Sequence, residues 1–120
     1  MSNIIFLCGE PGSGKTTIGK YLVKHYLKDF YFLDKDTLYS SLTGEIMSIL
    51  TNNQYDRDSP LYKNHCRNHE YNGLIDCAIE NAKLFKNSLI CSPFGKELSD
   101  ENIFLDFKKQ FKAIANTCFI

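Results

Sequence analysis

The chain has 120 residues, of which 43% are apolar and 13% aromatic, so it is long enough for one domain with a hydrophobic core. Its 14 basic and 14 acidic side chains cancel, which argues against a broad electrostatic surface for nucleic acid or for an anionic membrane. No apolar segment approaches the roughly 20 residues that span a bilayer. The first residues also lack the pattern of a signal peptide, so we expect a cytoplasmic protein.

An apolar segment and a glycine-rich loop open the chain. Ile4 to Cys8 predict a buried strand, and residues 9 to 16 read Gly-Glu-Pro-Gly-Ser-Gly-Lys-Thr, which matches the pattern G-x-x-x-x-G-K-[ST]. A helix is predicted from about Gly14 to Leu27, and its apolar face contains Ile18, Leu22 and Val23. This order of strand, loop and helix favours a phosphate-binding loop over a plain turn.

Each residue type in the loop suits a nucleoside triphosphate. Glycines let the backbone amides converge on phosphate oxygens, and the helix that follows adds the positive end of its dipole. Lys15 would place a cation against the terminal phosphates, and the Thr16 hydroxyl would bind Mg²⁺. The sequence therefore predicts ATP or GTP with Mg²⁺, bound by Gly9, Glu10, Pro11, Gly12, Ser13, Gly14, Lys15, Thr16 and Thr17.

Two carboxylates follow the second predicted strand, Tyr31 to Leu33. Asp34 and Asp36 alternate with Lys35, so in an extended chain both acids would point to one side. A carboxylate there could accept a proton from an attacking hydroxyl or help to hold Mg²⁺. One member, Asp36, could also cap the following helix, which is compatible with a functional pair.

The rest of the chain alternates helices and strands. In chain order we predict a helix (37–50), a polar break (51–60), a long helix (61–85), a strand (88–91), a helix capped by Ser99 (to about 112) and a strand (117–120). This alternation predicts an α/β domain over residues 1–120, with a parallel sheet covered on both faces. In such sheets ligands bind at the carboxyl ends of the strands.

Several side chains allow a structural interpretation. In the long helix, apolar spacing predicts a core of Tyr62, Tyr71, Leu74, Ile75, Ala78 and Ile79. His65 and His69 have metal-ligand spacing, but no second ligand pair accompanies them, which favours a solvated helix face. The five cysteines include no C-x-x-C pair, and those in strand-like segments, Cys8, Cys91 and Cys118, are predicted to be reduced and buried.

The loop, the segment Asp34-Lys35-Asp36-Thr37-Leu38 and the strand Leu89-Ile90-Cys91-Ser92-Pro93-Phe94 together resemble the P-loop kinase-like ATP-binding proteins. This group lies within the superfamily often labelled AAA-type ATPases and includes polynucleotide 5′-kinase, chloramphenicol phosphotransferase, zeta toxin and the gluconate and shikimate kinases. The resemblance implies the three-layer P-loop NTPase fold with strand order 2-3-1-4-5. Four of those strands are predicted here, so we expect the domain to be incomplete at its C-terminal end.

The resemblance also implies transfer of the γ-phosphoryl group of ATP or GTP to a hydroxyl. Asp36 best matches the acid that acts as base or substrate ligand, with Asp34 as its neighbour, and Lys15 contacts the transferred group. Many members hold the Mg²⁺ water shell with an Asp at the end of strand three, where this chain has Ser92. The Ser92 hydroxyl could bind a magnesium-bound water but contributes no charge, so Thr16 and Ser92 are the predicted metal-site residues.

Family members carry arginines on a lid after strand four, which lies beyond residue 120 in this numbering. Two arginines occur here, Arg57 and Arg67, and either could substitute for a lid residue or be a solvated surface charge. The final strand would leave an apolar sheet edge, which predicts a longer native chain or a partner at that edge.

Three hypotheses follow from these observations. The first is an ATP-dependent phosphotransferase that acts on the hydroxyl of a small molecule or of a nucleic acid end. The second is a nucleotide-binding module that binds ATP without efficient turnover, which Ser92 and the lack of lid arginines favour. The third, an NTPase that drives a partner, is disfavoured because no second acidic strand end is visible.

Overall fold

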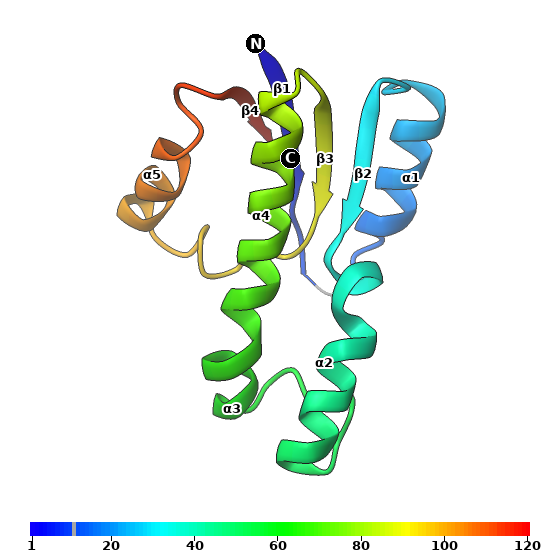
Figure 1. Cartoon of the computed structure of the whole chain (residues 1–120), viewed down its shortest axis with the longest axis vertical. Helices are drawn as coiled ribbons and strands as arrows, with labels where there is room; N and C mark the ends of the chain where they lie inside the picture. Colours follow the sequence, from blue (N-terminus) through cyan, green and yellow to red (C-terminus); the bar gives the residue numbers. More distant parts are fainter. Residues whose placement is uncertain (11) are drawn as a thin grey trace.

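The fold is a parallel sheet of four strands with helices on both faces (Figure 1). The computed structural model describes residues 1–10 and 12–120, so Pro11 of the predicted loop lies outside the described residues. The strands are β1 (Ser2–Leu7), β2 (Phe30–Asp34), β3 (Asn87–Cys91) and β4 (Ala115–Phe119), in the spatial order β2-β3-β1-β4. The α/β class and the predicted order of these four strands are confirmed.

The register of the sheet brings three strand ends to one level. Leu7 of β1 pairs with Cys91 of β3, and Cys91 pairs with Asp34 of β2. The residues that follow these positions are the glycine-rich loop, the start of a helix after Asp34, and Ser92. The sheet therefore places the three candidate segments at its carboxyl edge, as parallel strands require.

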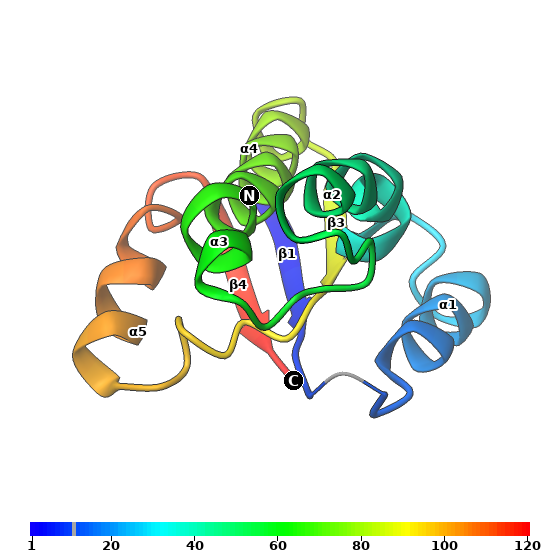
Figure 2. The same cartoon turned by 90° about the horizontal axis from the view of Figure 1, so that it is seen from below.

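The helices are α1 (Lys15–His25), α2 (Lys35–Thr51), α3 (Pro60–Tyr62), the π-helical turn η1 (Lys63–Arg67), α4 (Asn68–Lys83) and α5 (Glu101–Lys109). One face of the sheet packs against α1 through Leu22 and Val23, while the other face packs against α4, so these two helices lie on opposite sides (Figure 2). No helix in the described part of the chain is both long and apolar enough to cross a membrane.

The contact of α1 with the sheet is closest at a glycine. Gly19 is the buried residue of α1, and a Cβ placed there would lie 2.7 Å from Cys91 Sγ and 3.0 Å from a ring carbon of Phe32. The prediction that Ile18 shares the buried face is wrong, because its side chain is 51% exposed. Helix α1 therefore contacts the sheet through Gly19, which has no side chain, where the sequence pattern predicted the aliphatic side chain of Ile18.

We expect Gly19→Ala to lower the free energy of unfolding by about 1–2 kcal/mol. Overpacking a buried contact costs roughly 1–3 kcal/mol, and the better helix propensity of alanine returns about 1 kcal/mol at most. Urea denaturation measures the change. A matched Ser13→Ala variant, at an exposed loop position, should change stability by less than about 0.5 kcal/mol. A stabilised Gly19→Ala variant would contradict the close packing.

The core between the sheet and α4 is built around Phe6. Its ring stacks on Phe119 at 4.5 Å between centroids and meets the edges of Phe94 and Phe107 at 5.3 and 5.6 Å. The predicted core residues of the long helix pack here, apart from Tyr62, and include Tyr71, Leu74, Ile75, Ala78 and the partly buried Ile79. Phe94 is fully buried with a φ of 54°, a costly left-handed angle that turns the chain directly after Ser92 and Pro93.

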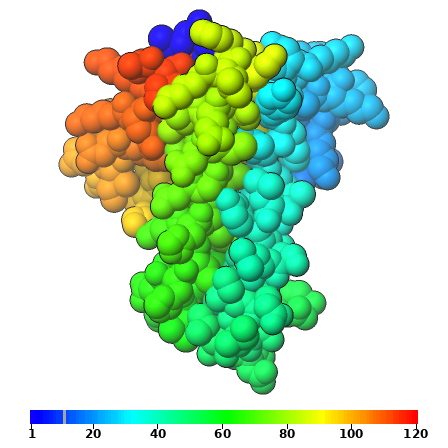
Figure 3. Space-filling model, in the orientation of Figure 1, coloured from blue at the N-terminus to red at the C-terminus, as the bar shows by residue number. Residues whose placement is uncertain are grey.

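A helical projection extends beyond the carboxyl ends of the strands (Figures 1 and 3). It consists of α2, α3, η1 and the first turns of α4, and Met47, Tyr62 and Cys66 form its small core. The predicted continuous helix over 61–85 is interrupted by the π-helical turn and ends at Lys83. This projection is the structure that faces the glycine-rich loop.

Two further details differ from the sequence predictions. Cys118 is exposed, because β4 is an edge strand that pairs only with β1 among the described residues. The cap of α5 is Asp100, whose carboxylate accepts hydrogen bonds from Asn102 N and Ile103 N, where Ser99 was predicted to act. All five cysteines are free thiols.

Candidate nucleotide-binding site

The loop between β1 and α1 contains glycines with left-handed backbone angles. Gly12 and Gly14 have φ values of 79° and 83°, and no atom lies within 4 Å of the position of a Cβ on either residue. Ser13 N donates a hydrogen bond to Glu10 O at 3.1 Å, and Gly14 is the N-cap of α1. This geometry lets a ligand approach the backbone closely, where the amides and the helix dipole favour an anion.

The lysine and threonine of the loop face different partners. Lys15 Nζ donates to the carbonyl oxygen of Glu10 at 3.3 Å, so the ammonium group lies against the loop backbone. Thr16 Oγ1 donates to Asp34 Oδ2 at 2.9 Å, which joins the start of α1 to the end of β2. The hydroxyl and the carboxylate are therefore adjacent, and both are oxygen ligands of the kind that Mg²⁺ prefers.

Asp34 and Asp36 do not share one side of an extended chain, so that prediction is wrong. Helix α2 begins at Lys35, and Asp34 Oδ1 accepts a hydrogen bond from Asp36 N at 2.9 Å, which makes Asp34 the N-cap. Asp34 is buried, whereas the side chain of Asp36 is 75% exposed. One acid is thus fixed by the loop and the helix, and the other is open to a ligand.

A cavity of about 480 Å³ lies between the loop and the helical projection. Its walls are Gly12, Gly14, Lys15, Thr16, Thr17, Lys35, Asp36, Arg57 and Pro93. Of the residues predicted from sequence, Gly9, Glu10, Ser13, Asp34 and Ser92 do not line it. Lys35 was not predicted as a site residue, and the only signal for it was its place between the two acids.

Lys35 is held by a buried polar network. Its Nζ lies 3.4 Å from Asp36 Oδ1 and 3.7 Å from Glu70 Oε1, and Glu70 is only 3% exposed. Glu70 also accepts hydrogen bonds from the hydroxyls of Thr43, at 2.7 Å, and Tyr62. Burial and the Glu70 carboxylate raise the pKa of Tyr62, so its hydroxyl stays a donor. The network fixes the ammonium group of Lys35 at the cavity wall.

The two arginines have different environments. Arg67 donates to Glu97 Oε1 at 3.1 Å, and its guanidinium lies 4.1 Å from the centre of the Tyr71 ring. Through this ion pair Arg67 joins η1 to the loop after β3. Arg57 lines the cavity and donates through Nη1 to the carbonyl oxygens of Gln54 and Asp56 at 2.9 and 2.8 Å. The structure therefore distinguishes Arg57, which lines the cavity, from Arg67, which does not, whereas sequence alone could not distinguish them.

Ser92 follows β3 beside the loop. It is 1% exposed, its N donates to Leu7 O at 3.3 Å, and its Oγ is the one buried side-chain oxygen or nitrogen without a hydrogen-bond partner among residues 1–10 and 12–120. Burial raises the pKa of Cys8 to about 11 and that of Cys91 to about 12, with smaller effects of Glu97 and Asp34 respectively. Both thiols are thus neutral at pH 7 and add no charge beside the loop.

These donors fit a magnesium-bound nucleoside triphosphate. The loop offers space and amides for phosphates, and Lys15 offers a cation. Oxygens are offered by Thr16 at the start of α1, by Asp34 at the end of β2 and by the unpartnered Ser92 Oγ directly after β3. Hard cations bind such oxygens directly or through water. His65 and His69 are exposed, and within the described residues no group of three or more His, Cys, Asp or Glu side chains could hold a metal ion by itself.

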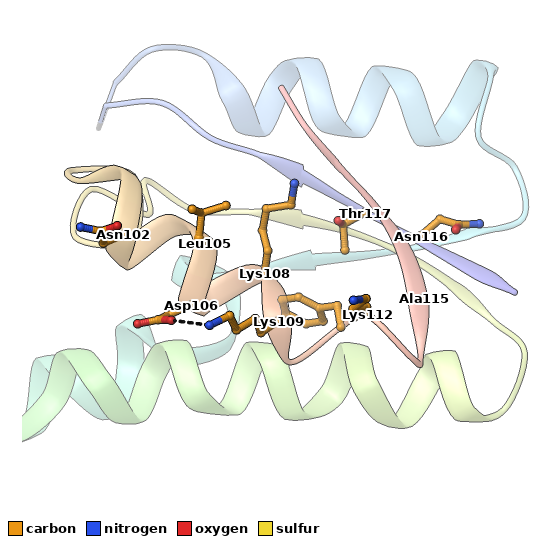
Figure 4. Close-up of a pocket in the computed structure, with 10 residues that line it drawn as sticks. Asn102, Leu105, Asp106, Lys108, Lys109, Lys112, Ala115, Asn116 and Thr117 are labelled. Carbon is orange, nitrogen blue, oxygen red and sulfur yellow. Dashed lines mark hydrogen bonds and ion pairs between the residues drawn. The ribbon is translucent and has the colours of Figure 1, made fainter.

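A larger cavity lies elsewhere, between α5 and the edge strand β4 (Figure 4). It has a volume of about 700 Å³ and combines apolar side chains with Lys108, Lys109 and Lys112. Lys109 pairs with Asp106 at 3.2 Å. The cavity shares no lining residue with the one at the glycine-rich loop, so it belongs to the sheet edge and not to the candidate site.

Comparison with known proteins supports the fold. The chain is similar to a chain in the structure of the Pnkp1/Rnl/Hen1 RNA repair complex, with 18% identity and a TM-score of 0.62 over 99% of its length. It is equally similar to a candidate kinase from Chloroflexus aurantiacus, with 18% identity and a TM-score of 0.61 over 99% of its length. The chain spans 32% and 57% of those two chains. It therefore has a P-loop kinase-like fold, while no family model and no curated protein matches its sequence.

Proposed function

We propose that the protein is a phosphotransferase that uses ATP or GTP with Mg²⁺ and phosphorylates a hydroxyl group. The observation that carries this proposal is the shared cavity, where the loop residues Lys15 and Thr16 face the exposed carboxylate of Asp36. Phosphoryl transfer requires a positioned triphosphate, charge stabilisation and a group that orients the acceptor hydroxyl, with little other chemistry from the protein. The kinase-like fold of the chain supports the same conclusion.

Each side chain has a role that follows from its position. Lys15 and the loop amides hold the β- and γ-phosphates, and Thr16, Asp34 and Ser92 hold the metal or its water shell. A bound Mg²⁺ would supply neutralisation of the phosphate charge. Asp36 accepts the proton of the acceptor hydroxyl, and Lys35, at 3.4 Å, orients its carboxylate.

The acceptor is a small molecule or a nucleic acid end. One structural neighbour belongs to an RNA repair complex, which favours a test of oligonucleotide 5′-hydroxyls. The balanced net charge favours local contacts with such a polymer, not a broad basic surface. The cytoplasmic location and a partner segment along the β4 edge, from the same chain or another, remain predictions.

A screen with γ-labelled ATP and GTP tests the proposal. Oligonucleotides with a 5′-hydroxyl and small hydroxyl compounds are the acceptors, and label transfer is the measurement. We expect Asp36→Asn to lower kcat about 10²- to 10⁴-fold without a loss of Mg·ATP affinity, because proton acceptance contributes that much to catalysis. Asp76→Asn, at an exposed position on α4, is the control.

Full transfer activity in Asp36→Asn would contradict the assigned role of Asp36. Binding of Mg·ATP without transfer to any acceptor would instead support the second hypothesis, a nucleotide-binding module without efficient turnover. Failure of the wild-type protein to bind either nucleotide would exclude both.

A further inference from the structure

A phosphotransferase needs a cation for the charge that spreads over the transferring phosphoryl group, and Lys15 alone is a limited source. The geometry points to Arg57 as the residue that contacts the γ-phosphoryl group during transfer and stabilises its charge. This inference rests on the proposed function. It assigns a further catalytic residue to the same cavity.

The position of Arg57 is the first observation. It lies in the loop between α2 and α3, on the wall of the helical projection, and lines the same cavity as Lys15 and Thr16. The loop between α2 and α3 therefore contributes an arginine to the wall of the cavity that the glycine-rich loop also lines. A phosphate held by the loop amides would lie between the two walls.

The support of Arg57 is the second observation. Asp56 Oδ1 accepts hydrogen bonds from the backbone of Asp58 and Ser59, both at 3.0 Å, which makes the turn compact and lowers the pKa of Asp56. The guanidinium lies 5.6 Å from the centre of the Tyr62 ring. Tyr62 in turn donates to the buried Glu70. The side chain is thus positioned by a built turn and an aromatic ring.

The charge balance is the third observation. Within the described residues, Arg67 is paired with Glu97 and Lys35 with Glu70 and Asp36, whereas no carboxylate oxygen lies within 4 Å of a guanidinium nitrogen of Arg57. Its hydrogen bonds to the protein use Nη1, so Nε and Nη2 retain donors for a ligand. An arginine with this fork geometry suits a phosphoryl group.

The step itself is a simple displacement. The acceptor oxygen forms a bond to the γ-phosphorus, the bond between that phosphorus and the β–γ bridging oxygen breaks, and the acceptor proton passes to Asp36. Arg57 forms no covalent bond. It donates hydrogen bonds to the γ-phosphoryl oxygens, whose charge is shared with the attacking and leaving oxygens in the transition state.

The test compares Arg57→Ala, Arg57→Lys and the control Lys63→Ala, which removes an exposed charge on η1. We expect Arg57→Ala to lower kcat about 10³-fold or more, with Mg·ATP affinity changed by less than about 3-fold, as for other arginines of this role. Arg57→Lys keeps the positive charge but lacks the planar, bidentate geometry of a guanidinium. Its kcat should therefore lie between those of Arg57→Ala and the wild type. Thermal unfolding of each variant confirms that the protein is folded.

A second measurement separates this inference from the proposed function. Mg·ADP with aluminium fluoride mimics the transferring group, and its affinity should fall in Arg57→Ala while the affinity for Mg·ATP does not. If the wild type binds this complex but phosphorylates no acceptor, the proposed function is wrong. The affinity of Arg57→Ala for the fluoride complex would still test whether Arg57 contacts the γ-phosphoryl group. Unchanged fluoride-complex affinity and kcat, or a raised acceptor KM at constant kcat, would overturn the inference.

Discussion

Replacement of Lys15 with alanine is expected to weaken Mg·ATP binding about 100-fold or more, which corresponds to roughly 2.7 kcal/mol. Lys15 is the one ammonium group of the glycine-rich loop, and its Nζ already lies against the loop backbone at Glu10 O. Its contact with phosphate oxygens is charge-assisted, and its removal leaves the loop itself with backbone amides and no cation for the phosphate charge. Isothermal titration calorimetry with Mg·ATP and Mg·GTP measures the loss.

Lys20→Ala is the matched control, because Lys20 is an exposed lysine on the same helix, α1. It should bind nucleotide like the wild type. If Lys15→Ala and Lys20→Ala bound Mg·ATP equally well, the loop would not be a triphosphate site and the proposed function would lose its basis.

Replacement of Glu70 with alanine is expected to lower the free energy of unfolding by about 3–5 kcal/mol, a large part of the roughly 5–15 kcal/mol typical of a domain. The change removes the buried carboxylate partner of Lys35 and the acceptor of the Thr43 and Tyr62 hydroxyls. The two hydroxyls would then lack an acceptor, and the buried Lys35 would keep only the exposed Asp36 as a partner, which costs more than the pair contributes when intact. Urea denaturation followed by circular dichroism measures the change.

Glu80→Ala is the control for this experiment, because Glu80 is exposed on the same helix, α4. It should change stability by less than about 0.5 kcal/mol. Glu70→Gln keeps the size and one acceptor oxygen and should fall between the two. If Glu70→Ala lowered the free energy of unfolding by less than about 1 kcal/mol, water would be replacing the carboxylate, and the network would not be sealed from solvent.

The sequence was sufficient to predict the sheet and its central loop. The pattern over residues 9–16 is local, and alternation of apolar strands with helices restricts the topology strongly, so the α/β class followed. The strand order came from the resemblance to the P-loop kinase-like proteins. The core face of α4 also followed, because helical spacing reports burial directly. The loop and the strand-end acids were therefore found without any structure, although their roles stay predictions.

The errors share a physical cause, which is competition between local conformations. Asp34 and Asp36 were expected in extended geometry, but α2 begins immediately after Asp34, two residues before the predicted start. This shift of the helix boundary placed the two carboxylates in different environments. Gly19 replaced Ile18 on the buried face of α1 because the helix lies too close to the sheet for a side chain there. Boundaries and rotations of this kind depend on tertiary packing.

Contacts between distant segments had no signal in the sequence. Lys35 and Glu70 meet only because α2 packs on α4. Arg67 is paired with Glu97, a residue of the loop after β3, whereas Arg57 lines the cavity at the glycine-rich loop. These pairs lie 30 or more positions apart. Pattern reasoning could name both arginines, but only the folded chain could distinguish them.

The carboxylate of Asp34 has one consequence for the energetics of the site. Oδ2 accepts a hydrogen bond from the Thr16 hydroxyl, and Oδ1 accepts one from the backbone amide of Asp36 in α2. A cation that binds the Thr16 oxygen must change the hydrogen bond from Thr16 to Asp34 Oδ2. Because Oδ1 of the same carboxylate accepts the Asp36 amide, this change also affects the first turn of α2. Nucleotide affinity and the fraying of that helix end are therefore linked reciprocally, so a change in one alters the other by the same coupling free energy.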